Sequence, residues 1–278
     1  MILPTANAPD ARSADAGDCL LKERRGAALY LTLNRPGRLN ALSDRLVDEL
    51  YATFAAMSDN SEVRVIVLAG AGRAFCAGFD VQDSDSAPGG QNAGEVLANQ
   101  RRISRIVAVM RSCPQPIICL LNGAAAGGGF ALALASDIRI GTPAARMNAA
   151  FIRLGLSGCD IGVSYFLPRL IGSSRAAYYL YTGAFMNAEQ GLACGLLLDV
   201  VQADALSARG DQIVEEMLYA SPLGLRLTKD TFNASIDAPS LAAVLAMEDR
   251  TQSLAALGPD FAEGIQAFRE RRKPEFRA

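Results

Sequence analysis

Short apolar runs that end in turn residues recur along the first half of the chain. The runs 27–33 (AALYLTL) and 63–68 (VRVIVL) are rich in Val, Ile, Leu and Tyr, and each is followed by Asn-Arg-Pro or Gly. This pattern predicts strands closed by turns. Similar runs predict a third strand at 117–121 and a fourth around 137–140.

Apolar residues at helical spacing separate these strands and then dominate the rest of the chain. A first helix is predicted around Ser43, a candidate N-cap, by Leu42, Leu46, Leu50, Phe54 and Met57. After about Ile161 the pattern is helical almost throughout, and one apolar face of the last helix is marked by Phe261, Ile265 and Phe268. Strands that alternate with helices predict an α/β architecture.

The chain is expected to divide into a tail, a core and a helical end. Residues 1–18 are rich in Ala, Asp and Pro without the charged-then-apolar order of a signal peptide, so we expect a flexible tail. Residues 19–200 hold the predicted strands, and residues 201–278 form a helical region expected to pack on the core or on a neighbouring subunit. The polar segment 83–94 is expected to be a mobile loop.

Composition excludes several classes of partner. The chain has 278 residues, half of them hydrophobic, and a net charge of -2, so it can bury a large core but has no basic field for nucleic acid. The apolar stretch 116–135 is interrupted by Asn122 and several glycines, so a strand, a turn and a buried helix fit it better than a membrane span. The six scattered cysteines are expected to be reduced thiols in a cytoplasmic protein.

The chain contains no histidine. This excludes Ser-His-Asp and Cys-His catalysis, and no histidine is available to complete a zinc site with the cysteines. We therefore expect no metal and no separate cofactor. Acid–base chemistry must be carried out by Asp, Glu, Lys, Tyr or Cys.

Two glycine-containing turns follow predicted strands, at 74–80 (AFCAGFD) and 122–130 (NGAAAGGGF). In the second turn the glycines open a helix from about Gly128, whose free N–H groups point beyond the strand. If an N–H of the first turn faces the same point, the pair forms an oxyanion hole, in which one donor contributes about 3 kcal/mol. Tight packing of the turns is the alternative interpretation.

A dinucleotide-binding fingerprint is disfavoured at the first turn. Gly70 and Gly72 follow a strand, but Phe75 stands where a third glycine is required. No acidic residue closes a second strand at the required distance.

Five segments, in this order, resemble the signature segments of the crotonase superfamily of enoyl-CoA hydratases and isomerases: 33–42 (LNRPGRLNAL), 74–80, 122–140, 167–172 (LPRLIG) and 263–276 (EGIQAFRERRKPEF). The resemblance implies an α/β fold, a crotonase-like spiral of ββα units with a helical C-terminal region. It also implies a homotrimer or hexamer and an acyl-CoA thioester substrate. The implied oxyanion donors are the N–H groups of Phe79 and Gly128.

The chain departs from the family at the two glutamates that hydratases use. Their positions are occupied here by Ala131 and Phe151. Asp160 resembles instead the aspartate that dienoyl-CoA isomerases, hydroxyisobutyryl-CoA hydrolases and a chlorobenzoyl-CoA dehalogenase use in the same segment. The alternative interpretation of Asp160 is an N-cap of the helix that follows. The next carboxylates to consider are Asp83, Asp85 and Glu95.

Cations and turn residues are expected to bind coenzyme A, which is part of the substrate. Arg35 and Arg38 flank the first signature segment, and Lys273 belongs to a basic cluster with Arg271 and Arg272 near the C-terminus. The resemblance adds Ala77 to these substrate-binding candidates. A solvated basic face is the alternative interpretation of the clusters.

The sequence therefore predicts an acyl-CoA-processing enzyme of the hydratase/isomerase type that stabilises a thioester enolate. One carboxylate suits a proton shuttle between neighbouring carbons, whereas hydration is easier with two. The alternative is a non-catalytic acyl-CoA-binding or regulatory homologue that kept the fold and lost the acids.

Overall fold

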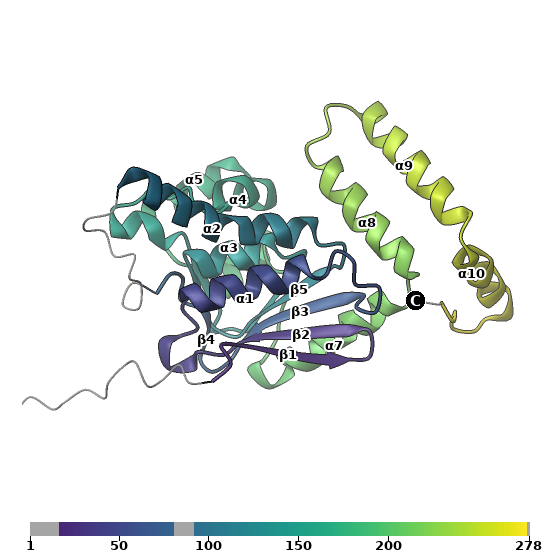
Figure 1. Ribbon diagram of the computed structural model, residues 1–278, viewed down its shortest axis with the longest axis horizontal. Coiled ribbons are helices and arrows are strands. Elements are labelled where there is room, and N and C mark those ends of the chain that lie inside the picture. The colour runs from purple at the N-terminus through teal and green to yellow at the C-terminus, as the bar shows by residue number, and fades with distance from the viewer. Residues whose placement is uncertain (1–16, 81–91, 277–278) are drawn as a thin grey trace, which may run out of the picture.

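Two β-sheets form the centre of the molecule (Figure 1). The computed structural model describes residues 17–80 and 92–276, so most of the expected tail and residues 83–91 of the expected loop lie outside the described residues. The larger sheet has the strand order β1 (Leu20–Arg25), β2 (Ala28–Leu33), β3 (Val65–Gly70), β5 (Ile117–Leu121), β7 (Ile138–Gly141) and β10 (Asp199–Val200). The smaller has the order β4 (Ala74–Cys76), β6 (Ala124–Ala126), β8 (Arg146–Asn148) and β9 (Met186–Asn187).

Successive strands of the chain alternate between the two sheets. The pairs β3 and β4, β5 and β6, and β7 and β8 each give one strand to each sheet. The helices that follow the three pairs are α2 (Ala93–Ser112), α3 (Gly128–Ala135) and the short 3₁₀ helix η3 (Ala150–Leu154). This repeat is the spiral of ββα units, so the predicted α/β crotonase-like fold is confirmed.

Helices cover both faces of the larger sheet. Helix α1 (Asp44–Ala55), α2 and α3 lie on one face, and α7 (Leu206–Leu218) lies on the other (Figure 1). Side chains of β3 alternate between these layers, because successive residues of a strand point to opposite faces. Ile66 and Leu68 belong to the main core cluster, while Val65 and Val67 pack in the cluster that includes Ile213 of α7.

The parallel register brings the loops that carry β4, β6 and β8 to one edge of the larger sheet. Leu31, Leu68, Cys119 and Arg139 are aligned across β2, β3, β5 and β7. The strands β2, β3, β5 and β7 are parallel, so their carboxyl ends meet at this edge. The two glycine turns lie there.

The C-terminal half is mainly helical, as expected. The helices beyond η3 are α4 (Val163–Ile171), α5 (Ser173–Thr182), α6 (Ala188–Ala193), α7, α8 (Pro222–Ser235), α9 (Leu241–Ala256) and α10 (Pro259–Glu270). Helices α8, α9 and α10 extend away from the sheets (Figure 1). None of the helices in the described part of the chain has the length and hydropathy needed to cross a membrane.

The sequence prediction was right about the elements with strong periodicity. The four expected strands correspond to β2, β3, β5 and β7, and Ser43 caps α1 by accepting a hydrogen bond from the N–H of Leu46 at 3.3 Å. The expected loop 83–94 was wrong at its end. Asn92 caps α2 there and forms a capping box with Glu95, so residues 93 and 94 are already helical.

Candidate active site

The two glycine turns adjoin at the edge of the sheets. Gly78, just after β4, has φ +94°, a conformation that glycine adopts without strain. A Cβ added there would lie 2.7 Å from the carbonyl oxygen of Ala126 and 3.4 Å from the backbone nitrogen of Gly128. The turns thus touch at backbone level, and any side chain at position 78 would separate them.

The backbone hydrogen bonds around the first turn leave the N–H of Phe79 unused. Leu42 donates to the carbonyl of Gly78 at 2.7 Å and accepts from the N–H of Asp80 at 3.2 Å. Because backbone groups alternate in direction along an extended segment, the N–H of Phe79 points away from Leu42. No other residue of the described chain accepts it.

The N–H of Gly128 is also unused. Gly128 is the first residue of α3, where an N–H has no partner within the helix, and no described residue outside the helix accepts it. Helix α3 is held against β4 by Gly129, since a Cβ there would lie 2.2 Å from the carbonyl oxygen of Cys76. Two unused donors therefore lie on touching turns; their convergence on one oxygen remains a prediction.

Asp160 lies in the segment between η3 and α4, half-buried. Its Oδ1 accepts a hydrogen bond from the N–H of Ile161 at 2.8 Å and another from the Nε2 of Gln100 on α2. Burial raises the pKa of Asp160, and the two hydrogen bonds oppose that rise. The cap interpretation was wrong, because α4 begins at Val163 and its N-cap is Gly162, without a side-chain cap.

Ile161 links Asp160 to the second glycine turn. The Cδ1 of Ile161 lies 3.6 Å from the place where a Cβ on Gly128 would stand, so the residue after Asp160 packs on the start of α3. Ile161 has φ 44°, which is a strained conformation for a β-branched residue. The residue directly after Asp160 therefore packs against the start of α3.

The positions of the two hydratase glutamates are apolar and buried. Ala131 is completely buried within α3, one turn after Gly128. The ring of Phe151 lies over Gly127, with Cε1 3.3 Å from the place where a Cβ would stand. No carboxylate can act from either position.

Arg35 lies in the interior, in contrast to the expected contact with a coenzyme A phosphate. Its side chain is 1% exposed and forms an ion pair with Asp80 at 2.9 Å. The same Nη1 donates to the carbonyl of Ala41 at 2.6 Å. In this position the guanidinium stabilises the first turn from inside the protein. It is not placed to bind a phosphate at the surface.

The other coenzyme A candidates lie in two separate places. Arg38 ends the 3₁₀ helix η2 (Pro36–Arg38), and the N–H of Ala77 in the first turn donates to the carbonyl of the next residue, Leu39, at 2.9 Å, so Arg38 lies beside the first turn.

Lys273 is exposed, with its Nζ 4.7 Å from the centroid of the Tyr219 ring. The residues on either side of Tyr219, Leu218 and Ala220, accept hydrogen bonds from Arg64, just before β3. Lys273 therefore lies at the amino ends of the parallel strands, whereas the glycine turns lie at their carboxyl ends.

The remaining acidic candidates lie elsewhere or have structural partners. Asp83 and Asp85 lie outside the described residues. Glu95 serves the capping box of α2, where its carboxylate accepts from the N–H of Asn92 at 3.1 Å. Asp80, at the end of the first turn, pairs with Arg35.

Gln100 is the one site residue that the sequence interpretation missed. It precedes the buried residue Ile103 by three positions, so it lies on the inward face of α2. That spacing was the only signal in the sequence. It does not reveal that the partner is Asp160, sixty positions further along the chain.

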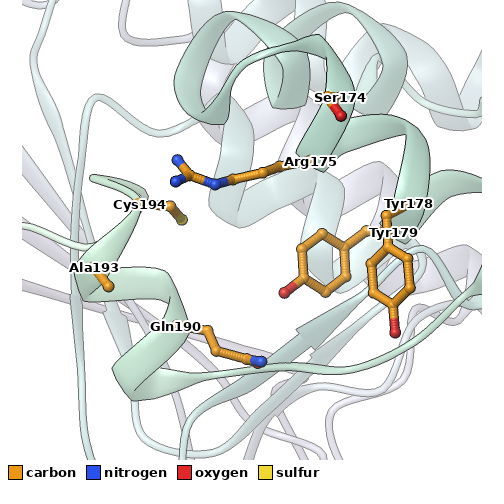
Figure 2. Close-up of a pocket in the computed structure, with 7 residues that line it drawn as sticks. All are labelled: Ser174, Arg175, Tyr178, Tyr179, Gln190, Ala193 and Cys194. Carbon is orange, nitrogen blue, oxygen red and sulfur yellow. The ribbon is translucent and has the colours of Figure 1, made fainter.

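A separate cavity of about 410 Å³ lies between α5 and α6 (Figure 2). Arg175 and Tyr179 on α5 and Gln190 on α6 face it, and Cys194 lies at its edge. None of the residues of the two turns lines this cavity, and Arg175 is its single charged side chain. No group of three or more His, Cys, Asp or Glu side chains within residues 17–80 and 92–276 could hold a metal ion.

Comparison with known proteins agrees with this architecture. The sequence model of enoyl-CoA hydratase/isomerase matches residues 23–278. The chain belongs to the enoyl-CoA hydratase/isomerase family. The resemblance to the crotonase superfamily is thereby confirmed. The chain is a member of a family of enzymes.

Relatives of this family carry different activity names. The 1,2-epoxyphenylacetyl-CoA isomerase of Escherichia coli strain K12 is 35% identical over 248 residues, which cover 89% of this chain and 94% of the relative. A Mycobacterium bovis protein named "Probable enoyl-CoA hydratase echA12" is 36% identical over 261 residues, with 92% of each chain covered. The crystal structure of an enoyl-CoA hydratase from Bacillus anthracis superposes with a TM-score of 0.87 at 31% identity, covering 93% of this chain and 99% of the other.

Proposed function

We propose that the protein acts on an acyl-CoA thioester by stabilising its enolate between the N–H groups of Phe79 and Gly128. Asp160 serves as the principal acid–base group. Each hydrogen bond strengthens as negative charge develops on the thioester oxygen, and one such donor contributes about 3 kcal/mol of transition-state stabilisation. The reaction is of the hydratase/isomerase type.

The observation that carries this proposal is the position of Asp160. It is a half-buried carboxylate, and the residue beside it packs on Gly128. Burial raises its pKa, which brings a carboxylate nearer to the range useful for proton transfer at neutral pH. Ala131 and Phe151 leave the region without the two carboxylates that would manage water addition easily.

A single carboxylate favours isomerisation within this family. With a 3-enoyl-CoA, Asp160 can take a proton from carbon 2 and return it to carbon 4, with the dienolate held in between. The similarity to a relative named 1,2-epoxyphenylacetyl-CoA isomerase also supports isomerisation as the type of reaction. Hydration requires a water to be activated at one carbon and a proton to be delivered at the other.

The coenzyme A end of the substrate is assigned to Arg38 and Ala77 of the same chain and to Lys273 of a neighbouring subunit. Ala77 of the first turn donates to Leu39, the residue that follows Arg38, so these two candidates lie close together. Lys273 lies beside Tyr219 at the amino ends of the strands, away from this turn, so we assign its contact with the phosphates to an assembly. We propose a homotrimer or hexamer built through the helical region 201–278.

The test compares turnover with binding across crotonyl-CoA and a panel of 3-enoyl-CoA thioesters. We expect turnover of at least one substrate, and we expect Asp160→Asn to lower that turnover by about a hundredfold or more. Binding of the acyl-CoA and the melting temperature should stay unchanged, since asparagine keeps the size of the side chain. An unaltered rate in Asp160→Asn would remove Asp160 from the mechanism. Tight binding without turnover of any thioester would favour the non-catalytic alternative.

A further inference from the structure

The two oxygens of the Asp160 carboxylate have unequal surroundings. Oδ1 accepts two hydrogen bonds, from the N–H of Ile161 at 2.8 Å and from the Nε2 of Gln100. Oδ2 accepts none from residues 17–80 or 92–276. One oxygen is therefore occupied by the protein and the other is available to a ligand.

The two donors to Oδ1 come from different elements. Ile161 follows Asp160 directly and is fixed by its packing on Gly128, so its N–H has a defined direction. Gln100 reaches across from α2, a 20-residue helix whose inner face is buried through Ile103, Ile106 and Val107. Two donors on separately anchored elements hold one rotamer of a carboxylate better than either alone.

We propose that Gln100 is a positioning residue that holds Oδ1 of Asp160, so that Oδ2 is the atom that exchanges a proton with the acyl group. This inference rests on the proposed function of Asp160. In the forward step Oδ2 takes a proton from a substrate carbon, and the electron pair of that C–H bond moves into the enolate. In the return step, with a 3-enoyl-CoA as substrate, Oδ2 gives the proton to carbon 4 of the resulting dienolate, so that the double bond moves from position 3 to position 2 and no other reactant is consumed.

Gln100 also acts on the acidity of Asp160. Its hydrogen bond stabilises the ionised carboxylate and lowers the pKa, which burial raises. Among the described residues no charged side chain shifts this pKa; the causes are burial and the two donors. Loss of the Gln100 donor therefore raises the pKa of Asp160 further.

The experiment replaces Gln100 by methionine, which keeps the length of the side chain and removes the donor. Asn99→Met is the matched control, because Asn99 is also half-buried on α2 and its side chain makes no hydrogen bond with the described residues. We expect Gln100→Met to lower kcat by about tenfold, which corresponds to about 1.4 kcal/mol, with KM nearly unchanged. Both variants should keep the wild-type melting temperature.

The pH profile of kcat/KM gives a readout that a purely structural role would not change. A base must be ionised, so activity falls as the pH drops through the pKa of Asp160, which lies above the ordinary aspartate value of 3.8. In Gln100→Met this acid limb should move to higher pH, while in Asn99→Met it should stay in place. If Gln100→Met is poorly folded, Gln100→Glu provides the same test. A second carboxylate beside Asp160 raises the pKa of Asp160 further, so the acid limb of kcat/KM moves to still higher pH.

A double variant separates this inference from the proposed function. If Gln100 acts through Asp160, adding Gln100→Met to Asp160→Asn should cause no further loss of activity. If Asp160→Asn is inactive but Gln100→Met keeps the wild-type rate and acid limb, the positioning role is overturned and the proposed function stands. If Asp160→Asn keeps full activity, both are overturned.

Discussion

At the scale of single residues, the buried pair of Arg35 and Asp80 supports the first turn. The Arg35 side chain is 1% exposed and that of Asp80 is 6% exposed, with 2.9 Å between Nη1 and Oδ2. Asp80 also donates its N–H to Leu42, which in turn binds the carbonyl of Gly78. The pair therefore fixes the same backbone that presents the N–H of Phe79.

Removing one partner of this pair should destabilise the protein strongly. In Asp80→Asn the buried guanidinium of Arg35 loses this carboxylate, and we expect the free energy of unfolding to fall by about 3–5 kcal/mol. Chemical denaturation measures this change. The control Asp59→Asn removes an exposed carboxylate and should leave the transition midpoint in place. Equal midpoints for the two variants would show that the pair does not stabilise the turn.

At the scale of elements, helix α8 is anchored to the core by a buried lysine. The Nζ of Lys229 lies 2.9 Å from Oδ2 of Asp137 and donates to the carbonyl of Gln115 at 2.8 Å. Asp137 also pairs with Arg111 on α2, at 2.9 Å. These contacts attach the helices that extend from the sheets to the strand and helix that frame the site.

Loss of this anchor should loosen α8 without unfolding the sheets. In Lys229→Met the ammonium is removed and Asp137 keeps Arg111, so we expect faster amide hydrogen exchange in α8 and unchanged exchange in β3 and β5. Mass spectrometry of exchanged peptides measures both regions in one experiment. Lys22→Met, on the exposed face of β1, is the control and should alter neither region. Exchange in α8 that matches this control would contradict the anchoring role.

The elements also show which parts of the structure were readable from sequence. The long periodic segments gave β2, β3, β5, β7 and α1 correctly, because each buries a continuous apolar face. The short strands β4, β6 and β8 have three residues each, too few for a period to be visible. Helix α2 was not predicted, although Ile103, Ile106 and Met110 have helical spacing. The polar residues before and at its start favour a loop.

The same limits apply to the candidate site. The turns at Gly78 and Gly128 were identified from glycines after strands, and their contact is present. Long-range pairs were not readable: Gln100 with Asp160, or Arg35 with Asp80, are neighbours only because the spiral brings distant segments to one edge. Arg35 was assigned to phosphate for this reason, since its charge is visible in the sequence and its burial is not.

At the scale of the whole molecule, α9 and α10 expose large apolar side chains. Leu257 is 86% exposed and Phe268 is 83% exposed, and Leu241 and Phe261 are also more than half exposed. Such a surface is expected to be covered in an assembly. In the proposed assembly, we expect this surface to bring Lys273 of one subunit towards the first turn of another.

Disrupting this surface should therefore separate the subunits. We expect the wild-type protein to sediment as a trimer or hexamer at micromolar concentration, and Leu257→Glu combined with Phe268→Glu to sediment as a smaller species. Leu21→Glu, which adds a charge at an exposed apolar position on β1, is the control and should keep the wild-type size. A wild-type protein that sediments as a stable monomer would contradict the proposed assembly.

Exchange of solvent deuterium into the acyl group reports proton transfer directly, whatever the net reaction. The protein is incubated in D₂O with the acyl-CoA that it binds most tightly, and NMR follows the carbons next to the thioester. We expect deuterium to enter these positions with the wild-type protein, and to enter about a hundredfold or more slowly with Asp160→Asn at equal substrate occupancy. Undiminished exchange in Asp160→Asn, or no exchange with the wild-type protein when the acyl-CoA is bound, would contradict enolate formation with Asp160 as the base.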